Sequence, residues 1–385
     1  MSWPTIPLGD AVTFKGGGTP SRRKAEYWGG AIPWATVKDF VSGNILGSTQ
    51  ESITEAGLHG SATNVVPAGT VIMPTRMALG KAAIAEVDMA INQDLKALIP
   101  TSDIEPRYLL WFLLANSTRI AAMGKGATVK GVTLDQLGSL AIPLPRPSEQ
   151  RRIAAILDKA DTLRAKRREA ITKLDQLLQS VFVDIFGDPA TNPKGWRIST
   201  IGEECHVGSG STPSRKNKAN FEGSIPWVRS TDVRWGKIVT TDEHVSLEAQ
   251  KAARLRLYPI GTIIVALYGQ GKTRGKCAVL GMPATINQAC AAISPSHNVD
   301  PMFLFHYLRL SYSRLRAESR GGNQENLNLG ILKSFPLIVP PFALQKRFAA
   351  YVEASSVQND ALHVGATALD SLFDSIQQRS FSNGL

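Results

Sequence analysis

The stretch Thr19-Pro20-Ser21-Arg22 returns unchanged as Thr212-Pro213-Ser214-Arg215, 193 residues further along the chain. Ile32-Pro33-Trp34 returns at the same offset as Ile225-Pro226-Trp227. The offset drifts to 195 by Ile91-Asn92-Gln93, which also has an unchanged second copy. Solenoid repeats have periods of about 20–50 residues, so this longer period indicates a duplicated domain. A duplicated domain presents two similar surfaces, which suits a target in two parts.

The composition favours a soluble protein with a polyanionic partner. A chain of 385 residues is long enough for two or three domains with cores of their own. Its 43 Lys and Arg against 32 Asp and Glu give a formal charge of +11, which points to nucleic acid, although many basic proteins have other partners. Cys205, Cys277 and Cys290 stand far apart, which argues against a disulfide framework or zinc site and fits a reducing cytoplasm. The apolar runs are too short to span a membrane, so we expect a cytoplasmic location.

Each copy has two parts of different character. The first part mixes glycine and proline with short apolar runs, and residues 69–74 and 261–266 are typical of buried strands. Residues 106–122 and 301–317 have helical patterns with proline near the start. This mixture predicts a compact α+β domain in each copy.

The second part of each copy predicts a long amphipathic helix. From residue 148 to 186 there is no glycine or proline, and apolar residues recur at three- and four-residue steps. Residues 344–379 repeat the pattern. Such helices need a partner, and a pseudo-two-fold axis between the copies would pair them as an antiparallel coiled coil. The alternative, in which each helix packs only on its own domain, is disfavoured by the helix length.

The predicted fold is therefore α+β, with two tandem domains alternating with two long helices. The expected boundaries are 1–146 for the first domain, 147–187 for the first helix, 188–341 for the second domain with its lead-in linker, and 342–385 for the second helix.

Several short motifs in register resemble one known family. They include the Gly16-Gly17-Gly18-Thr19-Pro20-Ser21 loop, the segment Tyr27 to Trp34, Glu149-Gln150-Arg151-Arg152, and Phe186-Gly187-Asp188-Pro189. In both copies and in this order, they resemble the specificity subunits of Type I restriction–modification enzymes. The resemblance covers nearly the whole chain.

The resemblance implies a subunit without catalytic activity or a cofactor of its own. Its two target-recognition domains would each read one half of a split double-stranded DNA target, and its helices would set the spacing. Two modification subunits would methylate adenine with S-adenosylmethionine, and motor–nuclease restriction subunits would use ATP and Mg²⁺. The alternative is a stand-alone DNA-binding scaffold of another phage-defence complex.

The residues themselves argue against an activity in this chain. An adenine methyltransferase needs Asn or Asp before Pro-Pro-aromatic, whereas Val339-Pro340-Pro341-Phe342 offers valine and predicts a turn before the second helix. A phosphate-binding loop would need glycine at Gln270, ahead of Gly275-Lys276. Asp94-Leu95-Lys96 has the form of a nuclease metal site, but a solvated turn is the commoner meaning of one such tripeptide.

The candidate DNA contacts lie in three pairs of loops rich in glycine and basic residues: 16–24 with 208–218, 76–81 with 268–276, and 125–130 with 320–326. Basic side chains there can neutralise phosphates, and Arg, Lys or Gln can address bases. The alternative for each is a solvated basic loop. The candidates are Lys15, Arg22, Arg23, Lys24, Arg76, Lys81, Lys125, Lys130, Arg215, Lys216, Lys218, Gln270, Lys272, Arg274, Lys276, Arg320 and Asn323.

Two further features have structural explanations. Trp34 and Trp227 follow Ile-Pro on predicted strands, so we expect them in the cores rather than stacked on bases. Arg164, Lys166, Arg167 and Arg168 form a basic run without a counterpart in the second helix. Contact with DNA or with an acidic partner helix is conceivable, but a solvated helix face is the expectation.

Overall fold

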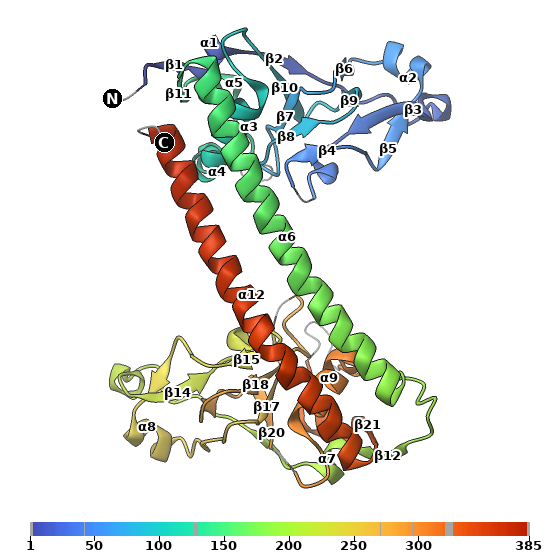
Figure 1. Cartoon of the computed structure of the whole chain (residues 1–385), viewed down its shortest axis with the longest axis vertical. Coiled ribbons are helices and arrows are strands. Elements are labelled where there is room, and N and C mark those ends of the chain that lie inside the picture. The colour runs from blue at the N-terminus through green and yellow to red at the C-terminus, as the bar shows by residue number, and fades with distance from the viewer. Residues whose placement is uncertain are drawn as a thin grey trace. The chain divides into compact units, whose positions relative to one another are not determined.

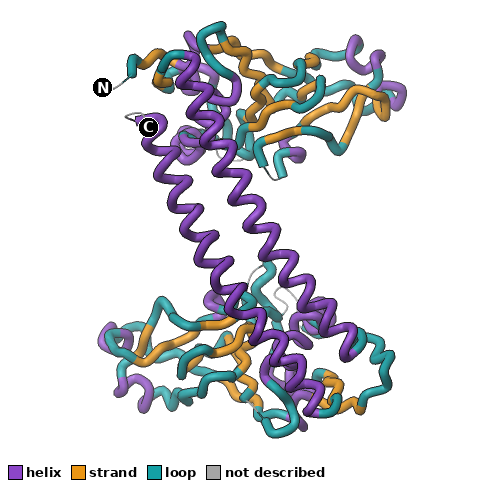
Figure 2. Tube along the Cα trace, in the orientation of Figure 1, coloured by secondary structure: helices purple, strands orange, loops and turns teal. Residues whose placement is uncertain are grey.

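The chain forms two compact units of matching design. The computed structural model describes residues 3–41, 43–126, 130–269, 271–294, 296–319 and 326–382. Unit 1 comprises Met1–Arg168 with Val364–Leu385, and unit 2 comprises Glu169–His363. In both, short strands alternate with loops and short helices (Figure 2). The α+β prediction is confirmed.

The described residues of unit 1 form three sheets. The five-stranded sheet has the order β2-β10-β7-β8-β4, a four-stranded sheet has the order β5-β3-β9-β6, and β1 pairs with β11. The strands are β1 Thr5–Pro7, β2 Val12–Gly16, β3 Trp28–Ala35, β4 Ile45–Leu46, β5 Glu51–Ile53, β6 Asn64–Val66, β7 Val71–Pro74, β8 Ala83–Ala85, β9 Met89–Ile91, β10 Leu95–Pro100 and β11 Ala141–Pro143.

Unit 2 repeats this plan, except that β6 has no counterpart among its described strands. Its five-stranded sheet has the order β13-β20-β17-β18-β15, a three-stranded sheet has the order β16-β14-β19, and β12 pairs with β21. The strands are β12 Arg197–Thr200, β13 Val207–Ser209, β14 Ile225–Val228, β15 Lys237–Ile238, β16 His244–Val245, β17 Ile263–Ala266, β18 Cys277–Leu280, β19 Thr285–Ile286, β20 Cys290–Ile293 and β21 Pro336–Val339. Even the parallel pair at one edge recurs, as β4 with β8 and β15 with β18. The duplication is therefore structural as well as sequential.

The short helices also correspond between the units. Unit 1 has α1 Leu8–Ala11, α2 Glu55–His59, α3 Pro106–Ala115, α4 Ser117–Met123 and α5 Leu134–Gly138. Unit 2 has α7 Ile201–Glu204, α8 Leu247–Ala252, α9 Pro301–Leu310, α10 Tyr312–Ala317 and α11 Leu329–Ser334.

The helices expected over 106–122 and 301–317 are each broken into two. The break in unit 1 falls at Asn116, whose ψ of 11° leaves the helical range. Its side-chain amide donates to the Phe112 carbonyl at 2.9 Å and so competes with the helical backbone pattern. Ser311 has a ψ of 6° at the matching place in unit 2.

Two long helices complete the units. Helix α6 spans Pro147–Phe186 and α12 spans Phe342–Ser382, close to the predicted ranges. In unit 1 the start of α6 packs beside the end of α12 (Figure 1). Arg164 on α6 pairs with Asp370 on α12, whereas Arg167 lies beside Gly365, so the partner number falls as the α6 number rises. The two helices run antiparallel, as predicted.

The basic run on α6 is not merely a solvated face. The Arg164 Nε lies 2.6 Å from an Asp370 carboxylate oxygen, and its guanidinium covers the Phe373 ring at 4.1 Å. Arg168 reaches the same carboxylate at 3.1 Å. The solvated-face expectation was therefore wrong for Arg164, which is 16% exposed against Asp370 and Phe373, whereas the Arg168 side chain is 60% exposed.

Aromatic side chains join the long helices to the cores. In unit 1, Phe373 and Phe381 of α12 contact Trp111 and Tyr108 of α3 at ring-centroid distances of 5.6 and 5.3 Å. In unit 2, Phe182 of α6 packs among three aromatic rings from α6, α9 and α12. Each unit thus contains the start of one long helix and the end of the other.

The cysteines are free and buried. No helix in the described part of the chain is long and apolar enough to cross a bilayer.

Candidate nucleic-acid interface

The arginine of the repeated Thr-Pro-Ser-Arg motif forms an ion pair inside unit 1. Arg22 donates to both carboxylate oxygens of Glu51 at 2.5 and 2.7 Å. Its guanidinium also lies over the Trp28 ring, 3.7 Å from the centroid. The hydrogen bonds from Arg22 lower the pKa of Glu51. Arg22 therefore fixes the loop after β2 against β3 and β5.

The same construction recurs in unit 2. Arg215 lies 2.8 Å from a carboxylate oxygen of Glu243. Its guanidinium covers the rings of Phe221 and Trp227 at 4.4 and 5.2 Å. Because the pair is the same in both copies, this arginine cannot by itself distinguish two different half-sites.

Other repeated residues hold the same loop in place. The Trp34 indole donates to the Gly18 carbonyl and the Trp227 indole to the Ser211 carbonyl, both at 3.1 Å. Both tryptophans are buried, which confirms them as core residues. Thr19 donates to the Gln93 side chain, and Thr212 and Gln288 form the matching bond.

Glycine is required where this loop passes another strand. A Cβ on Gly17 would lie 1.9 Å from the Ile91 carbonyl oxygen, and one on Gly210 would lie 2.0 Å from that of Ile286. The repeated motifs therefore form a frame, which we define as the loop after β2 or β13 with its ion pair, tryptophan and glycine contacts.

The remaining basic residues of the loops lie at the surface. Lys24 donates to the Tyr27 hydroxyl at 2.8 Å. The other candidates of this loop pair are exposed and are Lys15, Arg23, Lys216 and Lys218. They are available to phosphates, and their contact with DNA stays a prediction.

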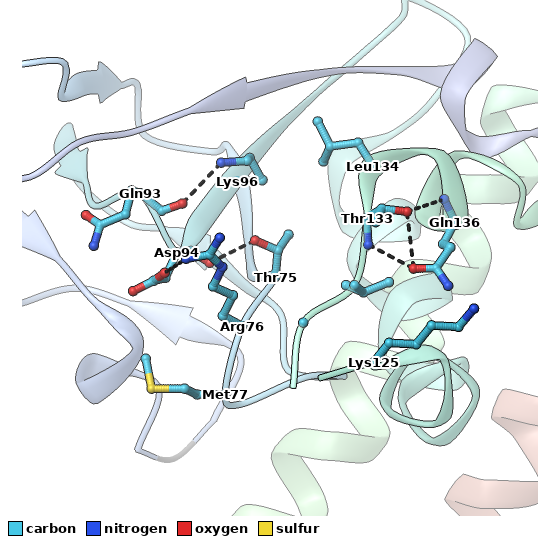
Figure 3. A pocket seen from close by; sticks show the side chains of 12 residues that line it. Thr75, Arg76, Met77, Gln93, Asp94, Lys96, Lys125, Thr133, Leu134 and Gln136 are labelled. Atoms are coloured by element: carbon cyan, nitrogen blue, oxygen red, sulfur yellow. Dashed lines mark hydrogen bonds and ion pairs between the residues drawn. The ribbon is translucent and has the colours of Figure 1, made fainter. Parts of the chain in front are cut away.

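Unit 1 also contains a cavity of about 990 Å³ beside the end of β7 (Figure 3). Arg76, Lys96 and Lys125 bring positive charge to its lining, and Asp94 brings a carboxylate. An Arg76 guanidinium nitrogen lies 3.7 Å from an Asp94 carboxylate oxygen. Burial, together with the nearby Arg76, lowers the pKa of Lys96. The cavity therefore presents donors and an acceptor side by side.

Asp94 and Lys96 were missed as candidates from the sequence. Asp94 lies in the turn before β10, but its side chain is only 13% exposed and Lys96 belongs to β10, so the expectation of a solvated turn was wrong. The sequence signal that could have identified them is an acidic and a basic residue on either side of Leu95, the first residue of β10. Among the described residues, no group of three His, Cys, Asp or Glu side chains is placed to hold a metal.

The other unit 1 candidates from these loops, Lys81 and Lys130, do not line this cavity. Lys81 donates to the Phe40 carbonyl at 2.5 Å. Lys130 is exposed, and its carbonyl accepts from the Met77 backbone. Met77 has a φ of 65°, which marks a sharp turn directly after Arg76.

The corresponding loop of unit 2 is built differently. Its carbonyls are held by helix α10, since Tyr312 donates to Lys272 at 2.6 Å and Arg316 donates to Arg274 at 2.7 Å. The Lys272 side chain is exposed, whereas Arg274 and Lys276 are half-buried. The candidates Gln270, Arg320 and Asn323 lie outside the described residues.

The sequence-family model of the Type I restriction modification DNA specificity domain matches residues 2–173 and again residues 193–363. Two such domains, each with this frame and a divergent loop beside it, define a specificity subunit of the Type I class. The chain belongs to this family.

Relatives agree with this assignment, and a solved structure has the same fold. The specificity subunit of the MjaIX Type I restriction enzyme of Methanocaldococcus jannaschii is 25% identical over 371 residues, covering 91% of this chain and 86% of the relative. An Escherichia coli Type I specificity subunit is 34% identical over 189 residues, or 47% of this chain and 46% of the relative. The crystal structure of a Type I S subunit from M. genitalium has a TM-score of 0.61 at 16% identity, covering 100% of this chain and 97% of that one.

Proposed function

We propose that this chain recognises a bipartite, asymmetric double-stranded DNA target, with one half-site for each unit. The observation that carries the proposal is the shared frame with different residues beside it. The Arg22–Glu51 and Arg215–Glu243 pairs repeat, whereas Arg76 is replaced by Tyr268 after the equivalent strand. Two similar supports with different reading side chains suit two different half-sites.

The charge of the chain supports the same proposal. Its formal charge is +11, and exposed lysines and arginines lie on the loops that flank the frames. Basic side chains that neutralise phosphates supply affinity without sequence information. We therefore assign affinity to the dispersed surface cations and selectivity to the residues that differ between units.

The long helices are the proposed docking surface for two methyltransferase subunits. Helix α12 exposes Val357, Val364 and Leu372, which are 76%, 70% and 54% accessible. Steps of seven and eight residues place them along one helix face. On α6, Leu163 and Leu177 are also exposed and stand two heptads apart. Apolar side chains at this spacing suit packing against partner helices.

Catalysis is assigned to those partners in this proposal. The methyltransferase subunits would bind S-adenosylmethionine and methylate adenine. Motor–nuclease restriction subunits would join the same assembly and use ATP and Mg²⁺. The present chain would contribute target recognition alone and bind no cofactor.

The first test is co-expression of the full chain with the methyltransferase encoded beside it, followed by methylome sequencing of the host. We expect a split adenine-methylated motif that disappears when this gene is deleted. A complex that forms on DNA without any methylated motif would refute the Type I assignment of function and favour a stand-alone DNA-binding scaffold of another phage-defence complex.

The second test addresses the modular reading of the two half-sites. Residues 1–142 are exchanged for the corresponding segment of another Type I specificity subunit, and the methylome is sequenced again. We expect one half of the motif to change and the other to persist. A change in both halves would rule out one half-site for each unit.

A further inference from the structure

The cavity of unit 1 differs from the matching region of unit 2 at three structurally equivalent positions. The Thr75 backbone donates to the Asp94 carbonyl at 2.8 Å, and the Leu267 backbone donates to the Ala289 carbonyl at the same distance. Asp94 of unit 1 is therefore structurally equivalent to Ala289 of unit 2. The same correspondence makes the next residues, Arg76 and Tyr268, equivalent.

The third position follows from the strand register. Lys96 stands opposite Met73 in the β10–β7 pair, and Ala291 stands opposite Val265 in the β20–β17 pair. Unit 1 thus has Arg, Asp and Lys where unit 2 has Tyr, Ala and Ala. The strands around these positions correspond in the two units, whereas the loop that follows Arg76 is built differently from the one that follows Tyr268.

We propose that Arg76, oriented by Asp94, reads a guanine in the half-site of unit 1, an inference that rests on the proposed function. A guanidinium can donate two parallel hydrogen bonds to guanine O6 and N7 in the major groove. The Arg76 side chain is 63% exposed, so its donors remain accessible to a base. Tyr268 lacks this donor fork, and unit 2 therefore reads a different base at the matching place.

The position of Asp94 is fixed from several sides. Its backbone N–H donates to the Asn92 side-chain oxygen at 3.1 Å, and its carbonyl accepts from both the backbone and the hydroxyl of Thr75. The Arg76–Asp94 separation of 3.7 Å is an ion-pair distance rather than a hydrogen bond. Asp94 therefore orients the guanidinium without occupying its donors.

The lining suits a base edge better than a phosphate. A phosphate at this place would meet the Asp94 carboxylate as well as the cations, and like charges repel. The major-groove edge of a G·C pair presents the guanine O6 and N7 acceptors beside the cytosine N4 donor, which matches a lining of Arg76, Lys96 and Asp94 (Figure 3).

The second repeat supplies the substitutions for a test. Arg76→Tyr and Asp94→Ala introduce the residues that unit 2 has at the equivalent positions, and the Arg76 side chain is 63% exposed, which limits the risk of misfolding. Arg119→Gln is the matched control, because Arg119 is an exposed arginine of unit 1 that does not line the cavity. Each full-length variant is co-expressed with the methyltransferase, and the methylated motif is determined by methylome sequencing.

We expect Arg76→Tyr to lose guanine preference at one base pair of one half-site. The loss is roughly 5- to 140-fold, the range for one bidentate arginine–guanine contact. Asp94→Ala should weaken the same preference by less, and Arg119→Gln should leave the motif unchanged. The other half-site should persist in all three.

A variant that gives no methylation is examined by binding. The purified complex is titrated with four duplexes that differ only at the base pair concerned. Equal weakening on all four would reduce Arg76 to a phosphate contact and overturn the proposal, as would an unchanged motif in Arg76→Tyr. Unchanged guanine preference in Asp94→Ala would remove the orienting role of Asp94. If the wild-type chain directs no bipartite motif, the proposed function fails and this inference falls with it.

Discussion

Replacing Phe182 by alanine should destabilise unit 2 and leave unit 1 intact. Phe182 is fully buried on α6, and its ring lies 4.8, 5.5 and 5.3 Å from those of Phe186, Phe303 and Phe348. Removing a buried phenylalanine ring costs about 3–5 kcal/mol, from lost burial and the cavity left behind. The cluster joins α6, α9 and α12, so their local opening should become easier together.

Native-state hydrogen exchange measures this effect for each unit separately. A loss of about 3–5 kcal/mol corresponds to amide exchange faster by roughly two to four orders of magnitude in the slowest-exchanging amides of α9. Peptides from α3 of unit 1 should keep their wild-type rates. A single unfolding free energy would not describe a chain of two units, which is why site-resolved exchange is the appropriate assay.

Leu177→Ala provides the control on the same helix. Leu177 is 57% exposed, so its truncation should change stability by less than about 0.5 kcal/mol. Equal acceleration of exchange in α3 and α9 after Phe182→Ala would refute the assignment of this cluster to unit 2. If Phe182→Ala accelerated exchange in α9 no more than Leu177→Ala does, the Phe182 cluster would not be what holds α6, α9 and α12 together.

Three further outcomes are expected. Burial lowers the pKa of His306 to about 4, below its unfolded value near 6.5, so its contribution to stability is complete above about pH 6.5 and is lost as the pH falls toward 4. The free energy of opening of α9, measured by hydrogen exchange, should therefore fall by up to about 1.4 kcal/mol per pH unit in that window, and His306→Leu should flatten the dependence; an unchanged slope in the variant would contradict it. Gly17→Ala should displace the loop, since its Cβ would lie 1.9 Å from the Ile91 carbonyl, and lower the melting temperature more than Gly29→Ala, where the φ of 78° is the only penalty; equal melting shifts would argue against the frame. Arg23→Ala should weaken binding to all duplexes alike and reduce the salt slope by about 1, measured by titration at several salt concentrations, whereas a changed base preference would contradict a phosphate contact.

The duplicated sheets and the long helices were predictable from the sequence. The repeated apolar runs at 69–74 and 261–266 form β7 and β17. They could be predicted because a short run of apolar residues between turn residues is the local pattern of a buried strand. The uninterrupted apolar stripe from 148 to 186 likewise became α6. Proposed domain boundaries at 146, 187 and 341 stay predictions, and the contacts divide the chain within both long helices instead.

The use of the arginines was not predictable. Arg22 and Glu51 stand 29 residues apart, on a loop and a strand that only the folded sheet brings together. Nothing in their local spacing distinguishes Arg22, which is held by Glu51 and Trp28, from Arg23, which has neither contact among the described residues. The Asp94 tripeptide was misjudged for the same reason, since its partner Arg76 belongs to a different strand end. Ion pairs between residues far apart in the sequence determine which charged side chains remain available to a ligand.

The division of unit 1 between residues 1–168 and 364–385 has a consequence for synthesis on the ribosome. Phe373 and Phe381 cover Trp111, Tyr108 and Phe112, but they emerge roughly 260–270 residues after them. At about 5–20 residues per second, that interval lasts on the order of 13–55 s. During this time the aromatic side chains of α3 lack their contacts with α12 and are exposed. Unit 2 is continuous in the chain and can fold first. The nascent protein is thus expected to finish its second half before its first and to depend most on chaperones in between.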